Sequence, residues 1–132
     1  MKSKEYQEIY DNTPIYENIA DPKRKEAPKT CGLYLIGNTI FNPFTNNRFY
    51  LVEVGMSTNL YNRMKAYRTM NPFIFHIDYK EIDKEEVYKA ETSCHIKLSK
   101  KALSRSDDAD EWFILSRQNY KKICEKGFSF FF

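Results

Sequence analysis

The fold is decided largely by residues 32–60, which read GLYLIGNTIFNPFTNNRFYLVEVGMSTNL. Two runs rich in β-branched, aromatic and leucine residues, 33–36 and 49–54, lie on either side of a polar segment. That segment contains two turn signals, Asn42-Pro43 and Asn46-Asn47. Strand-forming runs on both sides of such a turn predict a β-hairpin.

A helix is predicted directly after the hairpin. Gly55 ends the second strand, and either Ser57 or Thr58 is suited to cap the helix that follows. Pro72 is expected to stop this helix, because proline cannot continue it. The apolar stripe of the helix consists of Leu60, Met64 and Tyr67.

The rest of the chain predicts one more strand and two helices. Residues 73–79 are aromatic and β-branched, which favours a third strand. Apolar residues recur every three or four positions over about 84–103 and predict a long helix. A last helix is expected over about 116–126, with Gly127 at its C-terminal cap. We expect residues 128–132 to be buried, since four phenylalanines within five residues at a free end would invite association.

Length and composition are those of one globular domain. The chain has 132 residues, of which 42% are hydrophobic and 30% charged, so wholesale disorder and a small disulfide scaffold are both excluded. Residues 1–29 hold three of the five prolines and are interpreted as an N-terminal extension, with the domain at 30–132. The predicted fold class is α+β, an α/β sandwich-like arrangement in which helices flank a small, three-stranded, antiparallel-containing sheet.

Cysteine usage and hydropathy bear on the compartment. Three widely spaced cysteines without a CxxC pair fit a reducing, cytoplasmic compartment. No run of about 18 apolar residues occurs, so no membrane partner is expected. The net charge is only +3, but residues 92–106 hold four basic residues and no acidic one. This basic segment could form a face that binds a polyanion, or it could be a plain solvated helix surface.

Three groups of residues suggest chemistry. They are Gly32-Leu33-Tyr34 on the first strand, Gly55-x-Ser57-x-Asn59-Leu60-x-x-Arg63 at the strand-to-helix turn, and Glu91 with His95 on the long helix. Backbone N–H groups at the turn could meet a phosphate, and Arg63 would point at the same anion. For the turn, the alternative is a plain helix cap without a phosphate. For Glu91, the alternative is a carboxylate at the boundary of the apolar stripe that pairs with a lysine.

Together and in this order, the three groups resemble the GIY-YIG nuclease superfamily. Glu91 and His95, followed by Glu111-Trp112-Phe113, resemble its T5orf172 branch. The resemblance covers residues 32–113. It implies the GIY-YIG fold and a divalent-metal-dependent endonuclease that hydrolyses DNA phosphodiester bonds, with Mg²⁺ or Mn²⁺ as its cofactor.

The resemblance also implies roles for individual residues. Tyr34 would act near the attacking water, Arg63 would stabilise charge on the phosphoryl oxygens, and Glu91 would bind one divalent metal. Tyr67 falls at a position where the family commonly has histidine or tyrosine. We expect His95 to support Tyr34 or Glu91 by a hydrogen bond rather than to bind metal, because a Mg²⁺-type site prefers oxygen ligands.

Glu53 is the main departure from the family pattern. It stands where the second motif has tyrosine, or lysine in the T5orf172 branch, and it brings negative charge near an incoming phosphate. Glu53 could be a second metal ligand, a base, or a mark of lost activity. Tyr50 lies on the opposite strand face and is no substitute. If the chemistry runs, the side-chain tips of Tyr34, Glu53, Arg63 and Glu91 should converge in one cleft, and side chains of Arg63 and Glu91 on opposite faces would contradict the nuclease interpretation.

Nucleic-acid contacts are expected from the turn and from exposed basic residues that would bind phosphates without reading sequence. A catalytically inactive, nucleic-acid-binding or virion-associated protein of the same fold is the main alternative, and a module that does not bind nucleic acid is a third. No separate DNA-recognition module is expected. A homodimer, or a phage-protein partner docked through the extension, stays open. The expected contact residues are Ser57, Lys65, Arg68, Lys97, Lys100 and Lys101.

Overall fold

The computed structural model describes residues 26–70, 74–102, 104–105 and 112–132. Most of the N-terminal extension therefore lies outside the described residues, including a short helix that the spacing of Tyr6, Ile9 and Tyr10 predicts. The strands are β1 (Gly32–Asn42), β2 (Asn47–Ser57), β3 (Phe75–Glu81), β4 (Ser104–Arg105) and β5 (Trp112–Leu115). The helices are α3 (Leu60–Met70), α4 (Lys84–Lys101), α5 (Arg117–Lys126) and the short 3₁₀ helix η1 (Gly127–Phe130).

The predicted α+β class is confirmed, but the sheet has five strands in the order β3-β1-β2-β5-β4 rather than three. Every neighbouring pair is antiparallel. The two additional strands are β4 and β5, and β5 pairs with Tyr50–Glu53 of β2. Four residues that alternate between half-buried and buried positions carry too weak a pattern to be assigned from sequence without their partner strand.

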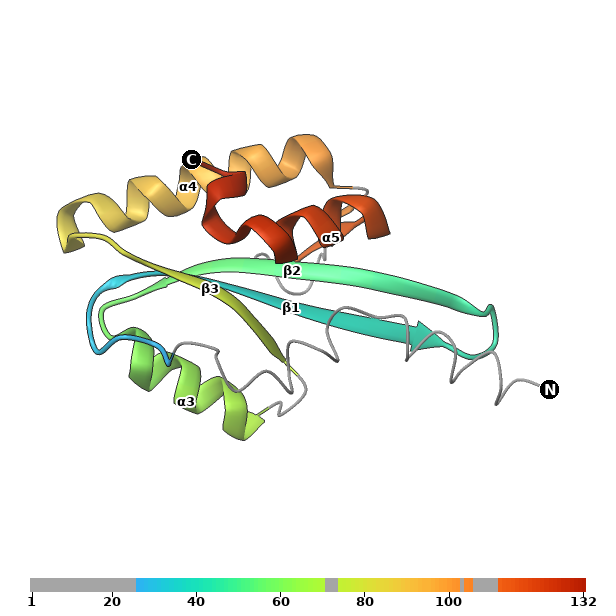
Figure 1. The fold of residues 1–132 in the computed structure, drawn as a ribbon, viewed down its shortest axis with the longest axis horizontal. Helices are drawn as coiled ribbons and strands as arrows, with labels where there is room; N and C mark the ends of the chain where they lie inside the picture. Colours follow the sequence, from blue (N-terminus) through green and yellow to red (C-terminus); the bar gives the residue numbers. More distant parts are fainter. Residues whose placement is uncertain (1–25, 71–73, 103, 106–111) are drawn as a thin grey trace.

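Helices cover both faces of this sheet (Figure 1), with α3 on one face and α4 and α5 on the other. Alternation along the strands divides their side chains between the two layers. Leu33 and Val54 pack in the core beneath α4 and α5, whereas Tyr34 and Ile36 pack with Leu60 of α3. Side chains that alternate with Val52 and Val54 on β2 therefore face α3.

Two short-range hydrogen bonds fix the start of α3. Asn59 is its cap, because Asn59 Oδ1 accepts a hydrogen bond from the Asn62 backbone N–H at 3.1 Å. Ser57 instead accepts from the Asn59 N–H at 3.1 Å, so the expected cap at Ser57 or Thr58 is wrong by one or two positions. Pro28 accepts a backbone hydrogen bond from Tyr61 at 3.0 Å, which ties the end of the extension to α3.

The C-terminal segment closes the other face. Gly127 has φ 58° and lies so close to Asp78 that an added Cβ would be 2.3 Å from Asp78 Oδ2, so glycine is required at this C-cap. The expected burial of the terminal residues is confirmed for Phe128 and Phe131, but Phe132 is 59% exposed. Among the helices described, none is long and apolar enough to span a membrane.

Candidate active site

Four side chains meet on the α3 face of the sheet. Glu53 Oε1 accepts hydrogen bonds from the hydroxyl groups of Tyr34, at 3.0 Å, and Tyr67, at 2.8 Å. The two hydroxyl oxygens are 3.4 Å apart, and Arg63 donates to the Tyr67 hydroxyl at 3.4 Å. The Arg63 guanidinium also lies 4.8 Å from the centre of the Tyr67 ring. β1, β2 and α3 thus bring together three of the four residues expected to converge, and Tyr67 with them.

Gly55 makes room for this cluster. It is paired with Tyr34 in the β1–β2 register, and the Tyr34 ring crosses directly over it. A Cβ at position 55 would be 2.1 Å from the Tyr34 hydroxyl oxygen. The expectation that Gly55 ends the second strand is wrong, because β2 continues to Ser57. The glycine of the second motif instead lets the Tyr34 side chain lie across the sheet toward Glu53. The sequence alone left this role unassigned, because it depends on the strand register.

The four side chains of the cluster differ in how deeply they are buried. Arg63 is exposed, Tyr67 is half-buried, and Tyr34 and Glu53 are each only 1% exposed. Tyr67 rather than Tyr34 is therefore the outer of the two hydroxyl groups. A ligand that reaches this face meets the Arg63 cation first and the Tyr67 hydroxyl next.

The electrostatics of the cluster keep both phenols protonated. Burial, and then the negative charge of Glu53, raise the pKa of Tyr34 far above its ordinary value. Burial is also the largest cause that raises the pKa of Tyr67. Hydrogen bonding with Tyr34 raises the pKa of Arg63, so its positive charge is secure. The resting cluster is a cation and two neutral phenols around a buried carboxyl group.

A spectrophotometric titration tests this state. Tyrosinate absorbance should show that Tyr34 and Tyr67 are among the tyrosines that ionise late as the pH rises past 10.0. Because their pKa values are raised in the folded state, their contribution to stability is complete below that pH and is lost above it, as the unfolded chain ionises first. Tyr34→Phe and Tyr67→Phe should each remove one late tyrosine. Two tyrosines that ionise with the rest would contradict the proposed electrostatics.

His95 has a different partner from either one expected. Its Nε2 hydrogen-bonds the Val54 carbonyl oxygen at 2.6 Å, and its ring lies 5.7 Å from that of Phe113. The pairing of β2 with β5 ends at Glu53 and Trp112, so the Val54 carbonyl lies just past the end of β5. His95 thus holds α4 against the edge of β2, next to the residue that carries the buried carboxyl group.

Glu91 lies half-buried on α4, one helical turn before His95. Arg63 and Glu91 therefore come from helices on opposite faces of the sheet (Figure 1). The predicted convergence is observed for Tyr34, Glu53 and Arg63, and it stays a prediction for the Glu91 side chain. Metal binding by Glu91 stays a prediction.

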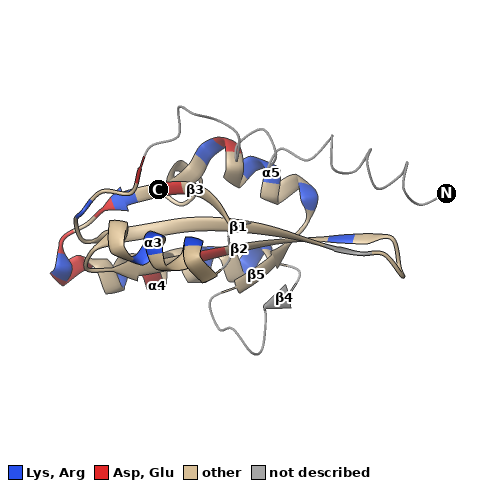
Figure 2. Ribbon diagram, turned by 90° about the horizontal axis from the view of Figure 1, so that it is seen from below, with Lys and Arg blue, Asp and Glu red and all other residues tan. Residues whose placement is uncertain are grey.

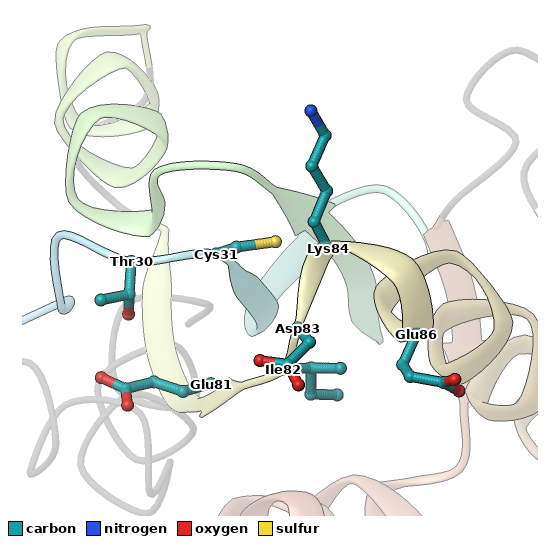
Figure 3. Close-up of a pocket in the computed structure, with 7 residues that line it drawn as sticks. All are labelled: Thr30, Cys31, Glu81, Ile82, Asp83, Lys84 and Glu86. Atoms are coloured by element: carbon teal, nitrogen blue, oxygen red, sulfur yellow. The ribbon is translucent and has the colours of Figure 1, made fainter.

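The expected nucleic-acid contacts also divide between the two faces. Lys65 and Arg68 are exposed on α3, whereas Lys97, Lys100 and Lys101 are exposed on α4 (Figure 2). Two of the α4 lysines contact the C-terminal residues. Lys97 Nζ hydrogen-bonds the Phe131 carbonyl oxygen, and Lys101 Nζ lies 5.8 Å from the centre of the Phe130 ring. These lysines do not form one continuous basic face with α3.

Ser57 occupies the turn but its hydroxyl group is engaged locally. It accepts from the Asn59 N–H and also donates to the Asn59 carbonyl oxygen at 2.9 Å. Its observed role is to shape the entry into α3, one turn before Arg63. A phosphate contact from Ser57 stays a prediction.

The residues present fit a divalent cation held by few protein ligands better than a metal held by a complete set of protein ligands. Within the described part of the chain, no three or more His, Cys, Asp or Glu side chains are grouped to hold a metal. Glu53 is buried and already accepts two hydrogen bonds, so Glu91 is the more accessible carboxylate. Mg²⁺ commonly uses one or two carboxylates, substrate phosphate oxygens and water, and such a site needs no dedicated cage.

A family model described as the T5orf172 domain matches residues 32–127, from the start of β1 to the end of α5. The chain belongs to the T5orf172 domain family. This assignment confirms the resemblance drawn from the three groups of residues and marks the chain as a nuclease-like domain. Comparisons with curated proteins and with solved structures returned no match.

Proposed function

We propose that this T5orf172 domain is a divalent-metal-dependent DNA endonuclease whose reacting groups lie on the α3 face. The observation that carries the proposal is the chain of contacts from the exposed Arg63 through Tyr67 to the buried Glu53. A guanidinium cation, a phenol hydroxyl group and a carboxyl group thus follow one another from the surface inward. This order supports the proposal, because phosphodiester hydrolysis is accelerated by a cation at the phosphate and by an acceptor for the proton of the attacking water.

Arg63 is assigned to the scissile phosphate. Its guanidinium is exposed and supported by the Tyr67 ring. A planar guanidinium can donate two parallel hydrogen bonds to phosphate oxygens and oppose the charge that develops on them. Lys65 and Arg68 on the same helix would hold flanking phosphates.

Glu53 is assigned as the base, with Tyr67 as the proton carrier. A water proton moves to the Tyr67 oxygen while the Tyr67 proton moves to Glu53 Oε1, over the 2.8 Å hydrogen bond between them. The resulting hydroxide attacks phosphorus, the bond to the leaving oxygen breaks, and that oxygen takes a proton from solvent. Because the pKa of Tyr67 is raised, a concerted transfer is favoured over a free phenolate. Tyr34 donates to the same carboxyl oxygen and fixes its position.

Glu91 is proposed to hold Mg²⁺ or Mn²⁺ together with the bound phosphate. The cation would supply charge neutralisation at the phosphoryl and leaving oxygens. One such centre cuts one strand, so cleavage of both strands needs a second subunit or a second event.

A plasmid-nicking assay tests the proposal. Supercoiled DNA should become nicked in the presence of Mg²⁺ or Mn²⁺ and stay intact with EDTA. Arg63→Gln should slow nicking about 100- to 1000-fold, because loss of one donor to a developing oxyanion typically costs that much. Lys122→Gln on α5 is the matched control and should nick as the wild type does. Absence of metal-dependent nicking by the wild type would refute the proposal.

Two observations favour a second function. The helix that carries Glu91 lies on the sheet face opposite to Arg63, and Glu53 replaces the family's tyrosine or lysine. A nucleic-acid-binding or virion-associated domain without catalysis would tolerate both features. It would bind DNA with an affinity that falls steeply with salt and would leave the DNA intact.

A further inference from the structure

The β1–β2 hairpin extends well beyond the rest of the sheet. Pairing of β1 with β3 ends at Gly37, and pairing of β2 with β5 starts at Tyr50. Residues 38–42 of β1 therefore pair only with β2, and residues 47–49 of β2 pair only with β1, so that this end of the hairpin is a two-stranded ribbon that projects from the domain (Figure 2). We call residues 38–49 the β-ribbon.

Large apolar side chains are exposed along the β-ribbon. Phe44, in the turn, is 92% exposed, Ile40 is 49% exposed and Phe49 is 40% exposed. Three such side chains lie exposed on one short segment, and exposed apolar clusters commonly mark an interaction site.

The polar residues of the β-ribbon indicate which kind of partner. Residues 38–49 read NTIFNPFTNNRF, with four asparagines, two threonines and one arginine, and without an acidic residue. The whole chain is 30% charged, so a twelve-residue stretch with one positive charge and no negative charge is unusual for its surface. Asparagine, threonine and arginine are the side chains that hydrogen-bond base edges and phosphates, and a phenylalanine can contact the methyl group of thymine.

The shape of the β-ribbon fits the same partner. The major groove of B-DNA is about 12 Å wide and admits a two-stranded ribbon. β2 carries Glu53 and starts at Asn47, so at about 3.3 Å per residue the turn lies roughly 20 Å from the reacting groups. That distance corresponds to about six base pairs along the duplex.

We propose that the β-ribbon binds in the major groove of duplex DNA about six base pairs from the scissile phosphate, with Phe44 against thymine methyl groups. The proposal rests on DNA as the substrate of the α3 face. It would give the domain a means of sequence preference, because Lys65 and Arg68 contact only the phosphate backbone in the proposed complex.

Binding measured without metal separates this proposal from catalysis. Fluorescence anisotropy in EDTA, with a thymine-containing duplex, should show that Phe44→Ala and Thr45→Asp each weaken affinity about five- to tenfold. Their matched controls on α4 are Tyr88→Ala, which also removes an exposed aromatic ring, and Thr92→Asp. Both controls should bind as the wild type does.

A base substitution tests the contact itself. Replacement of every thymine in the duplex by uracil removes the methyl groups and should weaken wild-type binding while leaving Phe44→Ala unaffected. Equal affinity of Phe44→Ala and the wild type would overturn the proposal and indicate that the β-ribbon docks a protein. Failure of the wild type to bind duplex DNA would overturn it as well. If binding depends on Phe44 but the protein does not nick DNA, the proposed endonuclease activity would be refuted and the proposed β-ribbon contact would stand.

Discussion

Replacement of Glu53 by glutamine is expected to slow nicking about 100- to 10,000-fold, the range typical of a lost general base. The amide has nearly the same shape as the carboxyl group but cannot take the proton that Tyr67 passes inward. Single-turnover nicking rates at saturating protein measure the effect. DNA affinity should stay unchanged, because Glu53 is buried beneath Tyr67 and Arg63.

Two further variants interpret that result. Tyr67→Phe should show a similar loss, since it breaks the path to Glu53, whereas Tyr34→Phe should have a smaller effect because Tyr34 only positions the carboxyl group. Glu53→Lys introduces the residue of the family branch. Lower activity of Glu53→Lys is expected if Glu53 is the base, whereas higher activity would show that the site has decayed from a more active ancestor.

Replacement of Glu91 by glutamine is expected to reduce nicking about a thousandfold, because a catalytic metal contributes several kcal/mol to phosphoryl chemistry. The substitution removes a metal-binding charge but little surface, so DNA binding in EDTA should be unchanged. Excess Mn²⁺ should restore part of the activity if the variant binds metal more weakly. Nicking rates as a function of Mg²⁺ and Mn²⁺ concentration measure this effect.

Glu86→Gln is the matched control, because Glu86 is an exposed glutamate on the same helix. It should leave nicking and its metal dependence as in the wild type. Full activity of Glu91→Gln would exclude Glu91 as the ligand and would leave the α3 face to act without α4. This outcome has a structural basis, since α3 and α4 lie on opposite faces of the sheet.

Local features of the fold could be predicted from the sequence. The hairpin, the following helix, the third strand and the long helix all follow from periodicity and turn residues, and Gly127 was correctly placed at the cap of α5. Strand β5 could not be assigned this way. Its four residues become a strand through pairing with the distant edge of β2, a contact that no local pattern contains.

The candidate site shows the same division. The family resemblance identifies Tyr34, Arg63 and Tyr67 as candidates, and Glu53 is the residue that departs from the family pattern. Their connection through hydrogen bonds depends on strand register and on the packing of α3. The expected partner of His95 was wrong for the same reason. From the sequence, we expect His95 to bond the side chain of Tyr34 or Glu91. In the structure, the pairing of β2 with β5 ends at Glu53, and His95 bonds the Val54 carbonyl oxygen just beyond it.

The sequence by itself determined the family, the order of the elements and the residue types available for chemistry, because these depend on local spacing along the chain. Only the tertiary structure decided which side chains share a face. It buried Glu53 beneath two tyrosines, placed Glu91 across the sheet from Arg63, and left the β-ribbon outside the core. The physical reason is that side chains alternate across a sheet, so which of them meet depends on register and on the helices that cover each face.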